Sequence, residues 1–109
     1  MSNHGGRSLD YSPSTLEVLP EIVDAVGSKV PILFDSGVRR GADALKALAL
    51  GARAVCLGRL PRWGLGAYGA PGVRRILEIM QAELVQAMAY TGRQSLASIN
   101  RTLVRTDFP

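Results

Sequence analysis

Residues 30–43, VPILFDSGVRRGAD, join an apolar run to the start of a helix through a short turn. Residues 30–34 are rich in strand formers, and residues 35–37, Asp-Ser-Gly, are typical of a turn. Gly41 then opens a helix with Asp43 in its first turn, where the helix dipole favours an anion. The apolar run therefore predicts a fully buried parallel strand that leads into a helix.

The same pattern recurs one helix later. Residues 42–50, ADALKALAL, are predicted to be helical with Gly51 just past their end, and residues 53–58, RAVCLG, form a second buried strand. The order strand, helix, strand predicts parallel pairing with a right-handed crossover. Cys56 lies inside the second run, so we interpret it as a buried small hydrophobe, with a reactive thiol as the alternative.

A helix is predicted before this unit. Ser14 can cap it, Gly27 ends it, and apolar residues recur between them with helical spacing at Leu16, Leu19, Ile22, Val23 and Val26. Pro20 has no amide hydrogen to donate to Leu16, so we expect either a kink or a helix that is regular only from Pro20 onward.

Two helices are predicted after the second strand. Residues 59–72 carry four glycines and two prolines, which predicts an irregular loop with room for a short turn of helix. A long helix should then run over residues 72–91 and stop at Gly92, and a short one should follow over residues 95–101. The apolar face of the long helix comprises Val73, Ile76, Leu77, Met80, Leu84, Val85 and Met88.

These elements place the chain in the α/β class, yet two parallel strands cannot cover three amphipathic helices or protect their own edges. We therefore expect residues 1–109 to be one portion of a larger domain. We also expect the chain to associate, as a homo-oligomer or with a complementary fragment.

The composition of the chain limits the kinds of partner that we expect it to bind. The net charge of +4 comes from 13 basic residues, of which 11 are arginine, and arginine suits bidentate binding of phosphate or carboxylate. The arginines form no basic run interleaved with aromatic residues, so we expect no nucleic-acid partner. No apolar run is long enough to cross a bilayer and no secretory signal is present, so we expect no membrane partner and a cytoplasmic location.

Both predicted strands end in glycine and arginine. Gly37 and Arg39 follow the first strand, and Gly58-Arg59 follow the second, 19 residues after Arg39. The amides of residues 38–41 would lead into a helix N-terminus, which suits an anion such as phosphate. In a (β/α)8 barrel the loops after strands 7 and 8 form a phosphate site of this kind. The alternative is that the glycines only make turns and the arginines are solvated.

The chain resembles the FMN-dependent α-hydroxy acid oxidases and dehydrogenases, which include glycolate oxidase, lactate oxidase and mandelate dehydrogenase. Residues 2–10, SNHGGRSLD, are similar to the family motif Ser-Asn-His-Gly-(Ala/Gly)-Arg-Gln-Leu-Asp, and residues 35–41 to Asp-Gly-Gly-(Val/Ile)-Arg-Arg-Gly. The spacing of 31 residues from His4 to Asp35 also agrees. The resemblance covers nearly the whole chain but only the C-terminal third of the family's barrel, which implies loop 6, helix 6, strand 7, helix 7, strand 8 and helix 8.

The resemblance also implies a function, the oxidation of a small 2-hydroxy acid to a 2-oxo acid with FMN. His4 would be the catalytic base, which takes the hydroxyl proton or, in an older scheme, the α-proton, and Arg7 would bind the substrate carboxylate. The residues implied in FMN binding are Ser2, Asp35, Ser36, Gly37, Val38, Arg39, Gly58 and Arg59.

The chain departs from the family motifs at three positions. It has Ser8 in place of Gln, Ser36 in place of the middle Gly, and Tyr11 where Gly is common. The upstream tyrosines, lysine and carboxylate of the family's site have no counterpart in this chain. The alternatives are thus a non-catalytic, association-prone fragment and a different FMN- or phosphate-binding barrel. His4 and Arg7 together favour the first family.

Overall fold

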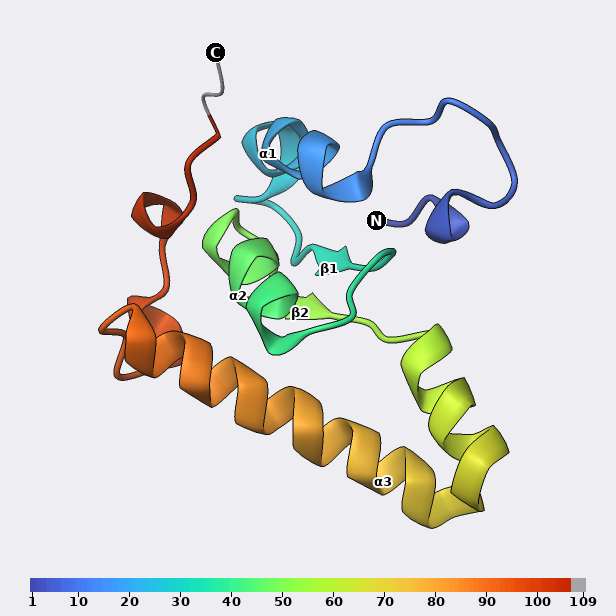
Figure 1. The fold of residues 1–109 in the computed structure, drawn as a ribbon. Coiled ribbons are helices and arrows are strands. Elements are labelled where there is room, and N and C mark those ends of the chain that lie inside the picture. The colour runs from blue at the N-terminus through green and yellow to red at the C-terminus, as the bar shows by residue number, and fades with distance from the viewer. Residues whose placement is uncertain (107–109) are drawn as a thin grey trace.

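The computed structural model describes residues 1–106, and its elements follow the predicted order (Figure 1). The helices and strands are α1 Thr15–Val26, β1 Leu33–Phe34, α2 Gly41–Ala49, β2 Ala54–Val55 and α3 Arg59–Tyr90. Short 3-10 helices occur at η1 His4–Gly6, η2 Leu96–Ser98 and η3 Arg101–Leu103. The predicted alternation of helices and strands is confirmed, although both strands are shorter than their apolar runs.

The two strands pair in parallel, as predicted, with Leu33 opposite Ala54 and Phe34 opposite Val55. The first residue of the chain lies along the other edge of β1. The Met1 amino group donates to the Leu33 carbonyl at 2.7 Å, and the Asp35 amide donates to the Met1 carbonyl at 3.1 Å. Because a parallel ladder pairs one residue with two partners in this way, the N-terminal residue extends the sheet beyond β1.

The sheet is covered on one face only, so the prediction of fully buried strands is wrong. Phe34 is 2% exposed whereas its neighbour Leu33 is 51% exposed. Successive side chains of a strand point to opposite faces, and within residues 1–106 the helices pack on the face of Phe34. The interpretation of Cys56 as buried fails for the same reason, because Cys56 is exposed.

A single apolar core joins the helices to the covered face of the sheet. Its buried members are Leu19, Ile32, Phe34, Val38, Ala47, Leu50, Ala52, Leu60 and Met80. Helix α1 begins at a capping box in which the Ser14 hydroxyl accepts from the Glu17 amide and the Glu17 carboxylate accepts from the Ser14 amide. Helix α1 is continuous from Thr15 past Pro20 to Val26. The prediction of a helix that becomes regular only from Pro20 onward is therefore wrong.

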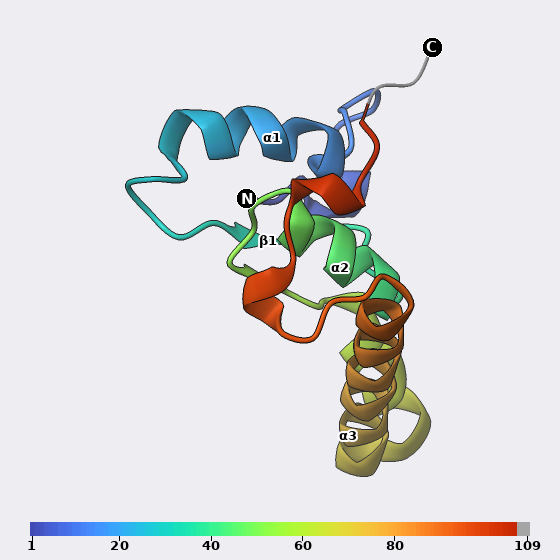
Figure 2. The same cartoon turned by 90° about the vertical axis from the view of Figure 1, so that its left-hand side faces the viewer.

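Residues 59–72 are mostly helical, which corrects the prediction of an irregular loop. Helix α3 consists of two arms, residues 59–67 and 70–90, that meet at non-helical Tyr68 and Gly69 (Figure 1). A side chain at Gly64 or Gly72 would overlap the backbone of the other arm. These two glycines therefore allow the arms to approach each other, and the joint between the arms lies away from the sheet (Figure 2).

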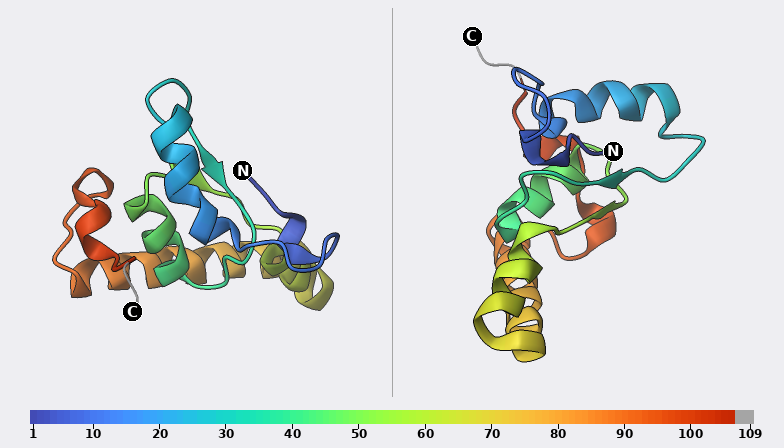
Figure 3. Two further views of the ribbon diagram at one scale, coloured as in Figure 1. Left: turned by 90° about the horizontal axis from the view of Figure 1, so that it is seen from above. Right: turned by 90° about the vertical axis from the view of Figure 1, so that its right-hand side faces the viewer.

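The predicted helix over residues 95–101 is replaced by the two short turns η2 and η3. Asn100 explains the interruption, because its side chain accepts from the Thr102 amide and starts a new turn. This segment folds back so that η3 contacts α2 (Figure 3). Within residues 1–106 no helix is long and apolar enough to cross a membrane.

Helices α2 and α3 meet at the first residue of α2. A side chain at Gly41 would overlap the backbone of Glu83 and Leu84, so the two helices touch there. The Glu83 carboxylate accepts from the Gly41 amide at 2.9 Å and from the Arg40 guanidinium at 2.8 Å. Hydrogen bonding from the Gly41 amide, and then from Arg40, holds the pKa of Glu83 below its usual value.

We predict that Glu83→Gln lowers the Tm of the chain by a few degrees near neutral pH, because the amide cannot supply the negative charge at the start of α2. The pKa of Glu83 is lowered in the folded state, so its stabilising contribution is present above about pH 4 and is lost as the pH falls through the folded pKa. Thermal unfolding of both proteins between pH 3 and pH 7 should show the difference shrinking towards acid.

Glu78→Gln is the matched control. The Glu78 carboxylate accepts from Arg74 and Arg75, and hydrogen bonding from these two residues holds its pKa low, yet it joins no second element. Exposed pairs within one helix contribute little. Equal losses of Tm in the two variants would contradict the role of Glu83 as a joint between α2 and α3.

Candidate functional site

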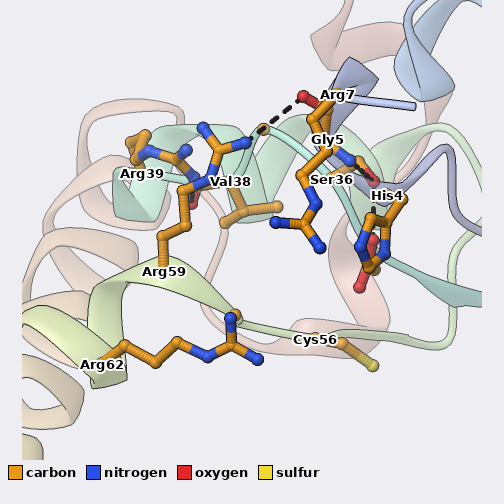
Figure 4. A pocket seen from close by; sticks show the side chains of 12 residues that line it. His4, Gly5, Arg7, Ser36, Val38, Arg39, Cys56, Arg59 and Arg62 are labelled. Carbon is orange, nitrogen blue, oxygen red and sulfur yellow. Dashed lines mark hydrogen bonds between the residues drawn. The ribbon is translucent and has the colours of Figure 1, made fainter. Parts of the chain in front are cut away.

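One hollow lies where both strands end and where the N-terminal loop crosses them (Figure 4). Its volume is about 180 Å³, below the 300–1,000 Å³ typical of pockets that enclose a whole small molecule. The hollow therefore suits one part of a ligand. It is lined by His4, Gly5, Arg7, Asp35, Ser36, Gly37, Val38, Arg39, Cys56, Gly58, Arg59 and Arg62.

The structure brings together the residues singled out in the sequence, although they come from three separate segments. His4 and Arg7 come from the N-terminal loop, residues 35–39 follow β1, and Gly58 and Arg59 follow β2. Ser2 does not line the hollow. Its hydroxyl instead donates to the carboxylate of a lining residue, Asp35, at 2.7 Å.

Four arginines give the hollow a strong positive charge. Arg39 lies over the Trp63 ring at 5.4 Å from the ring centre, and its guanidinium also donates to the Val38 carbonyl. Arg59 reaches the Gly5 carbonyl at 3.4 Å (Figure 4). These contacts occupy only part of the donor capacity of each guanidinium, since each has five N–H groups.

Arg62 is a lining residue that the sequence prediction missed. It lies three residues after Arg59 in α3, and residues three apart share one face of a helix. The sequence signal was therefore present as the spacing of two arginines. It was obscured because residues 59–72 were interpreted as a loop.

The Asp35 carboxylate also lines the hollow, and two hydroxyl groups of the adjoining loops hold it in place. One of its oxygens accepts from the Ser36 hydroxyl at 2.6 Å and from the Ser2 hydroxyl at 2.7 Å. Hydrogen bonding from Ser36, then from Ser2, lowers the pKa of Asp35, and the charges of the N-terminus and His4 act in the same direction. Asp35 is thus an ionised anchor for two hydroxyl groups.

The backbone amides of the loop after β1 fall into two groups. The Arg39 and Arg40 amides donate to the Asp43 carboxylate, and the Gly41 amide donates to Glu83. Carboxylates of the chain itself therefore accept from the amides of residues 39–41, at the helix N-terminus that the sequence predicts to suit an anion. Among residues 1–106, the amides of Gly37, Val38 and Gly58 have no hydrogen-bond partner.

Two side chains of the site stand on left-handed backbone. The φ angle is 57° at His4 and 88° at Ser36. Such conformations cost about 1 to 3 kcal/mol each for residues other than glycine and persist where surrounding contacts fix them. Asn3 fixes part of this loop, because its side-chain oxygen accepts from the Gly5 and Gly6 amides and its side-chain nitrogen donates to the Pro13 carbonyl.

Unpartnered amides beside several guanidinium groups match the chemistry of a phosphate. The volume of the hollow also fits a single phosphate better than a whole cofactor. The residues present therefore fit the terminal phosphate of a nucleotide, whose remaining parts would lie outside the hollow.

Comparison with protein families matches residues 1–106 to the family of FMN-dependent dehydrogenases. The chain belongs to this family, in which FMN is the cofactor. This match confirms the family resemblance that residues 2–10 and 35–41 indicated. The order of two short parallel strands and three helices is consistent with part of a barrel.

Individual relatives agree with the family. The chain is 54% identical over 105 residues to 2-hydroxyacid oxidase 1 of Homo sapiens, and 49% identical over 107 residues to a peroxisomal (S)-2-hydroxyacid oxidase of Arabidopsis thaliana. It covers 28% and 30% of those proteins, which in turn cover 96% and 98% of the chain.

A solved mandelate oxidase mutant, bearing a monooxide FMN adduct, superposes on the chain with a TM-score of 0.86 at 47% identity. The match covers 92% of this chain and 32% of that one. The chain thus spans about a third of the length of its relatives.

We predict that Ser2→Ala raises the pKa of Asp35 towards its ordinary value near 4, because the carboxylate loses one of two hydroxyl donors. The stabilising contribution of Asp35 is present above about pH 4 and is lost as the pH falls through the folded pKa, so the variant should lose it at a higher pH. Titration of the carboxyl carbon by NMR measures this shift.

Ser12→Ala is the control. It removes a hydroxyl that donates to the Leu9 carbonyl and should leave the titration of Asp35 unchanged. An unshifted Asp35 in Ser2→Ala would show that the bond contributes nothing.

Proposed function

We propose that this chain is the C-terminal portion of an enzyme that oxidises a small 2-hydroxy acid to a 2-oxo acid with FMN. The observation that carries the proposal is the convergence of His4, Arg7 and the two strand-end loops on one hollow. Membership of the FMN-dependent dehydrogenase family and 54% identity to a human 2-hydroxyacid oxidase support it.

We assign the elements to the last part of a (β/α)8 barrel. In this assignment residues 1–14 contain loop 6, β1 and β2 are strands 7 and 8, and α1, α2 and α3 are helices 6, 7 and 8. The pairing of Met1 along the free edge of β1 supports the assignment, because the residue before loop 6 should lie where strand 6 meets strand 7. Active sites of such barrels lie at the strand ends that bear the hollow.

Arg7 and His4 act on the substrate in this proposal. The Arg7 guanidinium binds the carboxylate of the 2-hydroxy acid through a planar fork of two N–H donors, which fixes the orientation of the α-carbon. His4 then takes the hydroxyl proton as general base, a step for which imidazole is suited near neutral pH. Both residues line the same hollow, as this division of roles requires (Figure 4).

The remaining site residues hold the cofactor in this proposal. FMN, when bound, supplies the acceptor for the hydride that leaves the α-carbon. Arg39 and Arg59, with the amides of Gly37, Val38 and Gly58, bind its phosphate. Ser2, Asp35 and Ser36, which the family resemblance also assigns to FMN binding, shape the adjoining loop. Arg62 adds positive charge to the same hollow.

The uncovered face of the sheet indicates the partner. Leu33 is half exposed and Cys56 is exposed beside β2, which leaves an apolar surface that the rest of a barrel would cover. We propose that the chain works in contact with the complementary part of such a barrel and that, by itself, it is inactive or forms homo-oligomers. A cytoplasmic location, one domain over residues 1–109 and the absence of nucleic-acid and membrane partners stay predictions.

In the experiment, this chain replaces the C-terminal third of a related 2-hydroxyacid oxidase, which gives a chimera. The chimera should be yellow and should lose its flavin absorbance with glycolate, lactate or mandelate.

In the chimera, His4→Ala should slow flavin reduction by about 100- to 10,000-fold because the base is lost, while the flavin stays bound. Stopped-flow absorbance measures the rate. A flavin that none of these 2-hydroxy acids reduces would contradict the proposed function.

Arg7→Lys should chiefly weaken substrate binding in the same chimera, because lysine cannot form the planar fork. We expect the apparent Kd for the 2-hydroxy acid to rise by about tenfold or more. Arg74→Lys is the control, since Arg74 pairs with Glu78 on the surface of α3 outside the hollow. Unchanged substrate binding in Arg7→Lys would refute the role of Arg7.

A further inference from the structure

We propose that the Ser36 hydroxyl is a positioning group for His4 and fixes the backbone on both sides of that residue. The inference rests on the proposed function for the role of His4. The hydrogen bonds that carry it lie between the loop after β1 and the N-terminal loop, and they stand independently of any flavin.

Ser36 holds two amides that flank His4. The Asn3 amide and the Gly5 amide both donate to the Ser36 hydroxyl oxygen, each at 3.2 Å. The same hydroxyl donates its hydrogen to the Asp35 carboxylate at 2.6 Å. Because an ionised carboxylate can only accept, this bond points the hydroxyl hydrogen at Asp35 and leaves the oxygen lone pairs for the two amides.

Ser2 completes the set by holding the amide of His4 itself. The His4 amide donates to the Ser2 hydroxyl oxygen at 3.1 Å, and that hydroxyl donates to the Asp35 carboxylate. Three consecutive amides therefore converge on two hydroxyl groups that one carboxylate orients. His4 is held at a φ angle of 57° within this arrangement.

Backbone conformation argues that the hydroxyl has a function at this position. Ser36 has a φ angle of 88°, a conformation that glycine adopts without strain and serine does not. The family motif has glycine here, so serine introduces strain that the hydroxyl contacts offset. The side chain of Ser36 consequently reaches across to a loop more than 30 residues away in the sequence.

The test compares Ser36→Gly with Ser36→Ala. Both variants lose the hydroxyl, but only glycine also relieves the backbone strain, so Ser36→Gly should have the higher Tm of the two. Both should make the Asn3 amide exchange its hydrogen at least about tenfold faster than in the original chain, as measured by NMR on the 109-residue chain without flavin. The Gly5 amide should change less, because it also donates to the Asn3 side-chain oxygen.

In the flavin-loaded chimera, both variants should reduce the flavin about tenfold more slowly at saturating 2-hydroxy acid, because small errors in the placement of a base are costly. Equal slowing despite different Tm values separates positioning from stability. The imidazole chemical shifts of His4 should move alike in both variants. Ser98→Ala, which removes a hydroxyl that bonds the Ser95 carbonyl outside the hollow, is the control.

The two proposals fail in different ways. An original exchange rate at the Asn3 amide together with an unchanged reduction rate in Ser36→Gly would overturn the role of Ser36. A chimera that no 2-hydroxy acid reduces would overturn the proposed function, and the exchange measurement would still decide whether Ser36 holds the loop.

Discussion

The parallel pairing of β1 with β2 brings together the charged groups of the two loops that follow these strands. The Cys56 amide donates to the Phe34 carbonyl at 2.7 Å, so the loops that follow the two strands leave the sheet at the same edge. Met1 pairs along the other side of β1 and delivers His4 and Arg7 to that edge. The helices bury Phe34 against the core and thereby hold this register.

Much of the fold could be predicted because its signals are local. Ser14 with Glu17, and Gly51 after α2, mark helix ends by hydrogen bonding and backbone conformation alone. Burial could not be predicted in the same way. The apolar residues around Leu33 and Cys56 are typical of a strand covered on both faces, but whether a face is covered depends on other elements. The glycines of residues 59–72 indicated a loop, whereas Gly64 and Gly72 serve close helix packing.

The functional site likewise has a part that could be predicted from the sequence and a part that could not. His4, Arg7 and the two glycine and arginine loops could be selected from motif and spacing, and the structure places them around one hollow. The partners of the amides after β1 could not, because Asp43 and Glu83 reach them only once α2 and α3 have formed. The left-handed backbone of Ser36 was indicated only by the family motif, which has glycine at that position, and its hydrogen bonds to the N-terminal loop could not be read from the sequence.

Helix α3 connects two regions that the sequence keeps well apart. Its first arm presents Arg59 and Arg62 to the hollow, while its second arm contacts α2 at Gly41. The arms touch at Gly64 and Gly72, where even a methyl group would push them apart. A side chain at either glycine would therefore displace the arm that carries Arg59 and Arg62, although neither glycine lines the hollow.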